Sequence, residues 1–461
     1  MEAAWAITVV SDKTWLHVVS EPAWQLSATL GGVLIQLLVQ PCFGVLRIQA
    51  PVTDNRADQA RDVRRALTAF IVAVAGLGLT SGIFETTFNN FLSDTFHITA
   101  GARGKLEFPR ELPGFLVALL GGALFFLTEI RLGTLAALVT ALGIAGLAAV
   151  GTSWGPMVFS MLLWSAGNHM LMPVNNTIAL RLAPPGRRAA RLGQIGAVGM
   201  AGTIVGSGLV WLGLEYLHIS YRGTFAIAGC GALVAAVFLA RIPALPSRGA
   251  QRPKLVLKQR YSLYYLLCVF SGARKQIFIT FGPWVLIKVF HEPAPTIAKL
   301  WIVASIIGIG FQPALGRVID RVGERAVLML DAVMIIGVCL GYGFAQAMPL
   351  ARPVHLVYVC YVLDNILFAM GMARATYIDK IAETEADIHA SLSVGVSIDH
   401  AVSMSIPTLG GWLWVQYGFP YVFAAAAAIA FCNLIAASFV RAPRRHAKVE
   451  ALPAAEVTGP D

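Results

Sequence analysis

The chain has 461 residues, of which 57% are hydrophobic and only 13% are charged, and its mean hydropathy is +0.69. A soluble chain carries roughly twice that density of charge. The composition therefore argues against a soluble enzyme, a secreted disulfide scaffold and a disordered chain. It suits a polytopic membrane protein, because twelve helices of about 20 residues would leave a similar length for connectors.

The net charge of +10 does not indicate a nucleic-acid partner, because the basic residues are dispersed among short connectors. The cysteines lie inside apolar runs and form no CxxC pair, so we expect no disulfide, no metal site and no cofactor. Lys13 is the only early positive charge, which argues against a cleaved export signal.

Twelve apolar runs predict membrane-spanning helices. They lie at residues 66–91, 106–127, 132–151, 157–180, 192–214, 223–240, 261–287, 300–315, 326–346, 354–373, 391–415 and 421–440. A further apolar segment precedes them, at residues 26–46. Three interpretations of it stay open: a thirteenth span that places Met1 outside, an interfacial helix, or upstream sequence without a role.

The segment 241–260 is the longest basic connector between spans, and Pro243, Pro246 and Pro253 oppose regular structure within it. It divides the spans six and six. The sequence therefore predicts five parts. They are an N-terminal extension (1–65), a first six-helix half (66–240), a cytoplasmic linker (241–260), a second six-helix half (261–440) and a cytoplasmic tail (441–461).

The distribution of Lys and Arg tests this assignment, because connectors on the cytoplasmic side carry an excess of both. Under the predicted topology 25 of the 35 basic residues fall on one side and seven on the other, with three inside spans. Both ends of the twelve-helix body are then cytoplasmic. We expect an integral protein of the bacterial inner (plasma) membrane.

The connector after the eighth span carries a recognisable motif, formed by Gly316, Asp320, Arg321, Gly323 and Arg325. It resembles the G-x-x-x-D-R-x-G-x-R signature of the major facilitator superfamily, which in that family follows the second helix of each half. The corresponding connector of the first half, residues 128–133, keeps an acid, an arginine and a glycine but not their spacing. Gly208-Leu209-Val210-Trp211 corresponds to Gly411-Trp412-Leu413-Trp414 in the second half, as expected for parallel repeats.

The resemblance implies an all-α fold of twelve transmembrane helices and a secondary transporter that works by alternating access. The protein would not be an enzyme, and we expect a monomer whose partners are the lipid bilayer, a small-molecule substrate and coupling protons. The five motif residues would control the conformational exchange. Sodium coupling and passive facilitation stay open, as do import and export.

Polar residues lie at the middle of three spans, where an ionisable group is costly unless it is paired or hydrated. They are Asn168, His169, Arg274, Lys275, Asp364 and Asn365. In the superfamily that the chain resembles, the fourth, seventh and tenth helices line the central cavity. We therefore predict that these residues bind the substrate.

Arg274 and Lys275 form a surplus of positive charge over Asp364, which favours an organic anion. The alternative is that the three charges form a structural pair without a ligand. His169 is either a proton carrier or a neutral hydrogen-bonded side chain.

Four further residues are candidates for coupling or gating. Glu85 and Arg110 would form an outer gate, unless they protrude above the hydrocarbon. Asp399 and His400 would pass a proton or brace their helix.

Alternative functions on the same fold are multidrug transport, sugar or nucleoside transport, and passive facilitation. A membrane-embedded enzyme is less favoured, because neither HExxH nor GxSxG occurs. A solute sensor would bind its ligand without moving it.

Overall fold

A computed structural model describes residues 56–120, 127–149, 153–184, 187–243 and 257–441. The apolar segment 26–46, most of the N-terminal extension, much of the linker and nearly all of the tail lie outside these ranges. Residues 60–461 form one compact unit. Throughout the described ranges the chain is helical and contains no strand.

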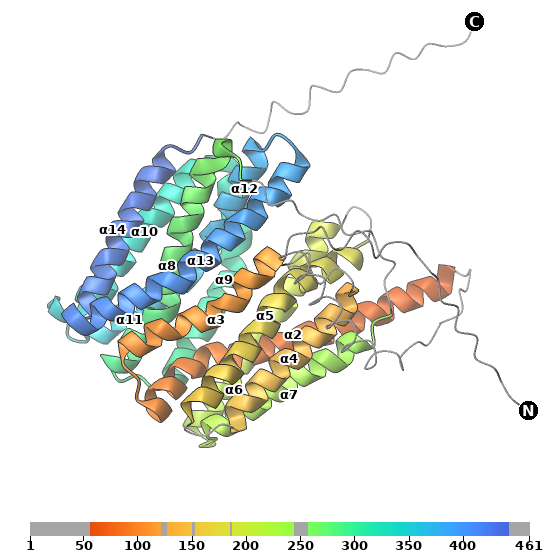
Figure 1. Cartoon of the computed structure of the whole chain (residues 1–461), viewed down its shortest axis with the longest axis horizontal. Helices are drawn as coiled ribbons and strands as arrows, with labels where there is room; N and C mark the ends of the chain where they lie inside the picture. The colour runs from red at the N-terminus through yellow and green to blue at the C-terminus, as the bar shows by residue number, and fades with distance from the viewer. Residues whose placement is uncertain (1–55, 121–126, 150–152, 185–186, 244–256, 442–461) are drawn as a thin grey trace, which may run out of the picture. The chain divides into compact units, whose positions relative to one another are not determined.

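The first half contains six helices, which Figure 1 labels along the chain. They are α2 (Arg56–Phe96), α3 (Ala100–Leu120), α4 (Glu129–Ala149), α5 (Trp154–Arg181), α6 (Arg188–Glu215) and α7 (Tyr221–Ala240).

The second half repeats this series after the linker. It contains η3 (Gln259–Tyr261), α8 (Ser262–Lys288), α9 (Ala294–Val322), α10 (Glu324–Phe344), η4 (Ala345–Ala347), α11 (Pro353–Leu367), η5 (Phe368–Met370), α12 (Gly371–Ile381), α13 (Glu385–Tyr417) and α14 (Phe419–Ser438). Each predicted span overlaps one helix, except that the tenth runs through α11, η5 and the start of α12. The prediction of an all-α polytopic fold is confirmed.

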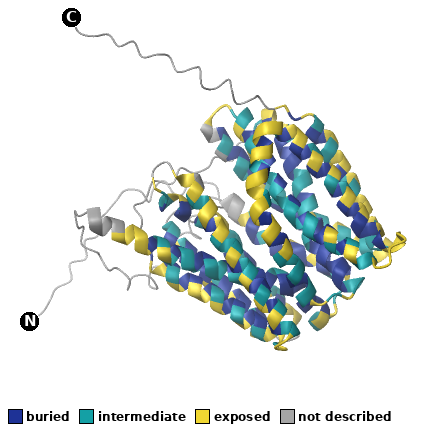
Figure 2. Cartoon of the chain, turned by 180° about the vertical axis from the view of Figure 1, so that it is seen from behind, coloured by how far each residue is buried: buried dark blue, intermediate teal, exposed yellow. Residues whose placement is uncertain are grey.

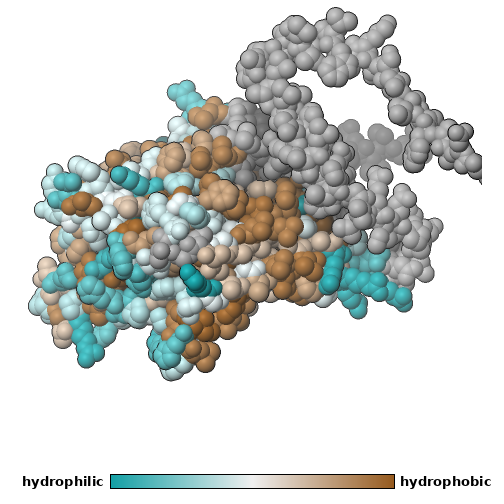
Figure 3. Space-filling model, turned by 60° about the horizontal axis from the view of Figure 1, so that its bottom comes forward, coloured by the Kyte–Doolittle hydropathy of each residue, from teal (hydrophilic) through white to brown (hydrophobic). Residues whose placement is uncertain are grey.

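Eight helices in the described ranges are long and apolar enough to cross a membrane, counting α11 to α12 as one segment. The other long helices are α3, α5, α8 and α13, which have 21 to 33 residues. Their lower apolar character has a local cause, because they carry the polar residues described below. On the face drawn in Figure 3, apolar side chains form broad brown areas between polar groups, as expected of a surface in contact with lipid.

Helix ends follow ordinary capping chemistry. The side chains of Ser220 and Thr384 accept hydrogen bonds from the backbone N–H groups of Gly223 and Asp387 at the starts of α7 and α13. Gly323 and Gly418 adopt positive φ angles of 92° and 99°, which allow α9 to turn into α10 and α13 into α14. The connectors between these helix pairs can therefore be single residues.

Three apolar clusters hold the bundle together. One contains buried residues of the second half only, and another contains buried residues of the first half only. The third joins the halves, because Trp284, Ala294 and Ala298 pack with first-half residues such as Phe84 and Phe88. In Figure 2, dark blue marks the buried residues, which occur along the helices among exposed residues in yellow.

We call the region where α3 and α9 begin and α6 and α13 end the closed end. Here α3 runs alongside α13 (Figure 1). A Cβ atom on Gly104 would lie 2.1 Å from the carbonyl oxygen of Pro407, and one on Gly411 would lie 2.7 Å from that of Ala100. Lys299 of α9 also pairs with Glu215 of α6 at 2.5 Å. Small residues therefore bring the halves into close contact.

We call the region where α6 and α8 begin and α9 ends the linker end. Here Gly193 and Gly196 of α6, and Gly316 of α9, have no atom within 4 Å of a Cβ added to them. A cavity of about 240 Å³ separates α6 from α9 nearby, with Met200 on one side. These faces of α6 and α9 are therefore not packed together.

One polar contact at the linker end lies outside the spanning segments. Lys258 Nζ lies 2.7 Å from Asp387 Oδ1, which links the start of the second half to the start of α13. The hydrogen bond raises the pKa of Lys258 and lowers the pKa of Asp387.

Candidate functional site

A central cavity of about 460 Å³ lies between the halves. Most of the predicted site residues line it, namely Asn168, His169, Arg274 and Lys275, together with Glu85, Arg110, Asp399 and His400. The remaining two lie beside it. Asp364 is buried behind Arg274, and Asn365 lines the smaller cavity between α6 and α9 and donates to the carbonyl oxygen of Tyr361.

Helix α3 presents four charged side chains on one face, because residues 103, 107, 110 and 111 are spaced by about one and two helical turns. Glu107 is fully buried and pairs with both Arg103 and Arg110, the latter at 2.7 Å. It also accepts a hydrogen bond from Gln276 of α8. Glu107 therefore links the two halves through one carboxylate.

The predicted Glu85–Arg110 gate has a different arrangement. The guanidinium of Arg110 contacts Glu107 and Glu111, the latter at 3.1 Å, rather than forming the expected ion pair with Glu85. Glu85 lines the same cavity. Glu107 and Glu111 lie on the same helix as Arg110, three residues before it and one after it, and this brings them closer to its guanidinium.

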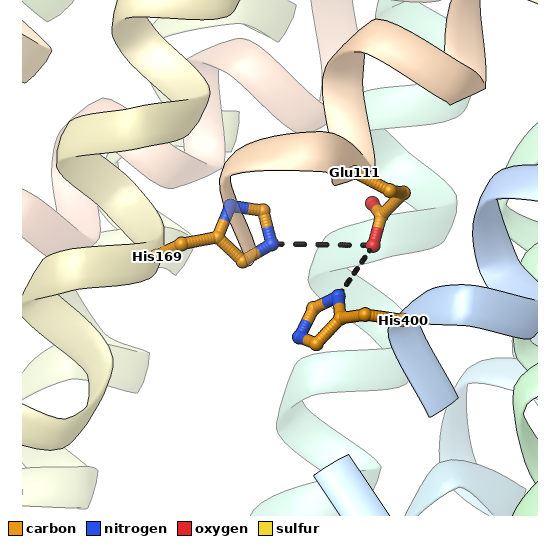
Figure 4. A group of neighbouring side chains, drawn as sticks. All are labelled: Glu111, His169 and His400. Atoms are coloured by element: carbon orange, nitrogen blue, oxygen red, sulfur yellow. Dashed lines mark hydrogen bonds and ion pairs between the residues drawn. The ribbon is translucent and has the colours of Figure 1, made fainter. Parts of the chain in front are cut away.

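A second link between the halves lies deeper in the cavity, where Glu111 of α3 meets two histidines (Figure 4). Glu111 Oε2 lies 3.0 Å from His400 Nδ1 on α13 and 4.0 Å from His169 Nε2 on α5. His169 Nδ1 lies 2.8 Å from the backbone oxygen of Ser165. Glu111, His169 and His400 could hold a metal ion, because their ligand atoms all lie within 4.8 Å of one another.

Gly114 explains how the two imidazoles fit together. A Cβ atom at this position would lie 2.5 Å from His169 Cδ2 and 2.6 Å from His400 Cε1. Only a glycine therefore leaves room for both rings at their observed positions beside α3.

Arg274 and Lys275 of α8 have more charged partners than we expected from the sequence. Arg274 lies 3.4 Å from Asp331 and 3.6 Å from Asp364, and Lys275 pairs with Asp399. The expected surplus of positive charge at these two residues is therefore not present. Asp399 contacts Lys275 while its neighbour His400 contacts Glu111, so the two residues do not act as one pair.

Arg274 nevertheless keeps unused hydrogen-bonding capacity. Its Nε and one terminal nitrogen make no hydrogen bond within the described part of the chain. The contact with the backbone oxygen of Leu367 is long, at 3.4 Å, and the ring of Phe368 lies 5.3 Å from the guanidinium carbon. Arg374, on α12, adds another cation to the cavity wall. Two guanidinium groups therefore lie at the cavity wall, although the nitrogens of Arg274 that lack a hydrogen bond are themselves buried.

Three residues of this site were missed from the sequence. Asp331 lies within the predicted ninth span, so the rule applied to the other buried charges would have identified it. Arg374 was assigned to the cytoplasmic connector after the tenth span. Gln276 is uncharged, so the criterion of ionisable groups within spans did not identify it.

The motif residues lie where α9 ends and α10 begins. Asp320, Arg321 and Arg325 are exposed, and Gly316 and Gly323 are partly exposed. The buried charge in this segment is Glu324, which pairs with Lys380 of α12 at 2.6 Å. The motif region is therefore connected to the rest of the second half through Glu324.

Comparisons with known proteins agree with this architecture. Among solved structures, the nucleoside transporter NupG in a mutant form has a TM-score of 0.68 at 17% identity, over 81% of this chain and 98% of its own. The D-xylose-proton symporter gives 0.62 at 14% identity, with coverages of 82% and 98%. A bacterial homologue of the human lysosomal transporter Spinster gives 0.56 at 15% identity, with coverages of 81% and 93%.

At these identities the structural likeness establishes the fold alone. The sequence model of the Major Facilitator Superfamily matches residues 70–388, which is more than half of the chain and extends through both halves. The chain therefore belongs to the major facilitator superfamily.

Proposed function

We propose that this protein is a secondary transporter, not an enzyme, and that it moves a small carboxylate-bearing solute by alternating access with proton coupling. The observation that carries the proposal is the cavity between the halves, whose wall includes the guanidinium group of Arg274. Arg274 suits a carboxylate because a planar guanidinium can form two parallel hydrogen bonds with it. Arg374 provides a second positive charge on the same wall.

Alternating access requires the two ends of the interface to open in turn. The closed end is packed through Gly104 and Gly411, whereas the faces of α6 and α9 at the linker end are apart. This conformation therefore corresponds to access from the linker end. The five motif residues lie at that end and would control its closure.

We assign the linker end to the cytoplasm. The connectors 181–191 and 241–260 belong to this end and contain four and six basic residues. Cysteines introduced at Arg188 or Arg260 should then resist an impermeant reagent added to intact cells. Ready labelling from outside would reverse the orientation.

Proton coupling has a candidate site in the second half. Asp331 and Asp364 both lie near Arg274, and Arg374 is the other cation close to Asp331. The uncharged titratable neighbours of Asp364 are Cys339, Tyr342, Cys360 and Tyr361. A substrate carboxylate that binds Arg274 competes with these aspartates for one guanidinium.

The competition has an electrostatic consequence. A buried carboxylate that loses its cation costs several kcal/mol unless it takes up a proton. Binding of the anion and of a proton would therefore be linked. The coupling role expected of Glu85, Arg110, Asp399 and His400 is then indirect. Of these residues, His400 joins the halves through Glu111, whereas Arg110 pairs within α3 and Asp399 pairs with Lys275 of the same half.

The test begins with a thermal-shift screen of the purified full-length protein against organic anions, sugars, nucleosides and cationic drugs. We expect stabilisation by an anion. Arg274→Ala should then weaken binding of that anion at least tenfold, because a charge-assisted hydrogen bond contributes about 1.5–3 kcal/mol. Arg274→Lys should recover part of the affinity, since it keeps the charge but loses the bidentate geometry.

Arg222→Ala is the matched control, because Arg222 is exposed at the start of α7. It should leave the affinity unchanged. A folded Arg274→Ala protein with wild-type affinity would contradict the anion site. If Arg274→Ala unfolds while Asp364→Asn binds normally, the charges of this cluster have a structural role instead.

A further inference from the structure

We propose that Glu111, His169 and His400 form a binding site for a divalent transition-metal ion of the Zn²⁺ class. The three residues come from α3, α5 and α13 and are separated by at least 58 positions in the chain, so no local sequence motif indicates the site. Imidazole and carboxylate groups together are common ligands of Zn²⁺ and of Co²⁺ and Ni²⁺. Figure 4 shows the three side chains converging on one point.

The distances require little adjustment to accept an ion. Ligand atoms in a tetrahedral zinc site lie about 3.3 Å apart, given metal–ligand bonds of about 2.0–2.1 Å. Glu111 Oε2 is 3.0 Å from His400 Nδ1 and 4.0 Å from His169 Nε2. Small side-chain rotations would bring all three atoms to bonding distance.

The surrounding groups orient these ligands. The contact of His169 Nδ1 with the backbone oxygen of Ser165 at 2.8 Å places the ring proton on Nδ1 and leaves the lone pair on Nε2, toward Glu111. Arg110 contacts Glu111 Oε1 at 3.1 Å and leaves Oε2 facing the histidines. This pattern, in which the second nitrogen of a histidine donates to a carbonyl oxygen, is typical of metal-ligating histidines.

The local charge also permits a dication. Arg110 is paired with Glu107 as well as Glu111, and Lys275 is paired with Asp399. Glu85 adds a further carboxylate to the cavity wall. The nearby cations are therefore offset by carboxylates before the ion binds.

The position of the site predicts its effect on the protein. Glu111 and His169 belong to the first half and His400 to the second, so the ion would bridge the halves in this conformation. A ligand that binds one conformation better shifts the population toward it. Given the proposed transport function, a bound ion should slow turnover.

Metal binding is measured directly on the purified full-length protein. Titration with Co²⁺ should produce visible d–d absorption bands, and calorimetry with Zn²⁺ should give one site per chain. Replacing a first ligand should cost more than the 10- to 100-fold typical of outer-shell partners. We therefore expect His169→Ala and His400→Ala each to weaken Zn²⁺ binding at least tenfold.

His355→Ala is the matched control, because His355 is exposed at the start of α11 and should not affect binding. Failure of the wild-type protein to bind Co²⁺ or Zn²⁺ would overturn the proposal, as would unchanged binding by a folded His169→Ala/His400→Ala protein. Because binding is read without a transported substrate, these outcomes are independent of the proposed function. In transport assays, Zn²⁺ should inhibit the wild type more strongly than His400→Ala.

Discussion

The two ends of the interface between the halves use the same kind of residue in opposite ways. At the closed end, Gly104 and Gly411 are in such close contact that an added Cβ would overlap a backbone oxygen. At the linker end, Gly196 of α6 and Gly316 of α9 face open space. Small residues let helix backbones approach each other closely. The glycines of the linker end are therefore suited to forming the contact that the closed end makes now.

The comparison also suggests why the closed end can separate. Besides close packing, it is joined by the Lys299–Glu215 pair, whose side chains are 40% and 34% exposed. Exposed ion pairs contribute at most about 1 kcal/mol. Packing, including the cluster that Trp284 forms with Phe84 and Phe88, should therefore contribute more to the stability of this end than this ion pair does.

The largest effect should come from filling the closed end. Gly104→Leu places a side chain where the oxygen of Pro407 lies 2.1 Å from the Cβ position, so α3 and α13 must move apart. Overpacking of this kind costs about 1–3 kcal/mol. We expect a lower thermal midpoint and a more than tenfold loss of transport.

Gly155→Leu is the control for this substitution. Gly155 lies at the start of α5, and a Cβ atom there meets nothing within 4 Å. It should retain wild-type stability and transport. If Gly104→Leu behaves like Gly155→Leu, the close contact between α3 and α13 is not needed for the cycle.

A smaller and more selective effect is expected at the linker end. Gly196→Leu should change the free energy of unfolding by no more than about 0.5 kcal/mol, because the position is open in this conformation. Its thermal midpoint should therefore stay close to that of the wild type. Transport should nevertheless fall several-fold, since the new side chain would obstruct closure against α9. Gly208→Leu, on the same helix and also free of neighbours, should transport normally. Full transport by Gly196→Leu would show that this face never closes.

The smallest effect is expected at the conformational motif. Asp320 is exposed in this conformation. Asp320→Asn should therefore change the affinity for the substrate little. Transport should fall a few-fold if Asp320 acts only when the linker end closes. Parallel flux and binding measurements decide this, and an equal loss of both in a folded protein would argue against a gating role.

Most of the fold could be predicted from the sequence, because hydropathy alone reports which segments avoid water. The four long helices that are less apolar than the other spans by mean hydropathy, α3, α5, α8 and α13, were also predicted from their apolar runs, and the distribution of basic residues supported the assignment. The depth of the polar residues was also informative. Of the six residues grouped from sequence, Asn168, His169, Arg274 and Lys275 line one cavity, whereas Asp364 and Asn365 do not line it.

The pairing of charges could not be predicted, because it depends on helix rotation and on contacts between distant helices. His400 was expected to act with its sequence neighbour Asp399, yet it contacts Glu111, 289 positions away. Arg274 was matched with Asp364 alone, although Asp331 of α10 lies slightly closer. One sequence shows which charges are buried but not which of them meet.

Alternating access at the two ends is the central claim, and pulsed electron paramagnetic resonance tests it most directly. Spin labels at the exposed positions Leu217 and Met348 report the closed end, and labels at Arg188 and Val322 report the linker end. The six native cysteines are replaced first. The transported solute is then added and the pH is changed. We predict that the distance between labels at the closed end lengthens and that the distance at the linker end shortens. The same fraction of molecules should show both changes. Distances that stay fixed, or that change in the same direction at both ends, would contradict the account.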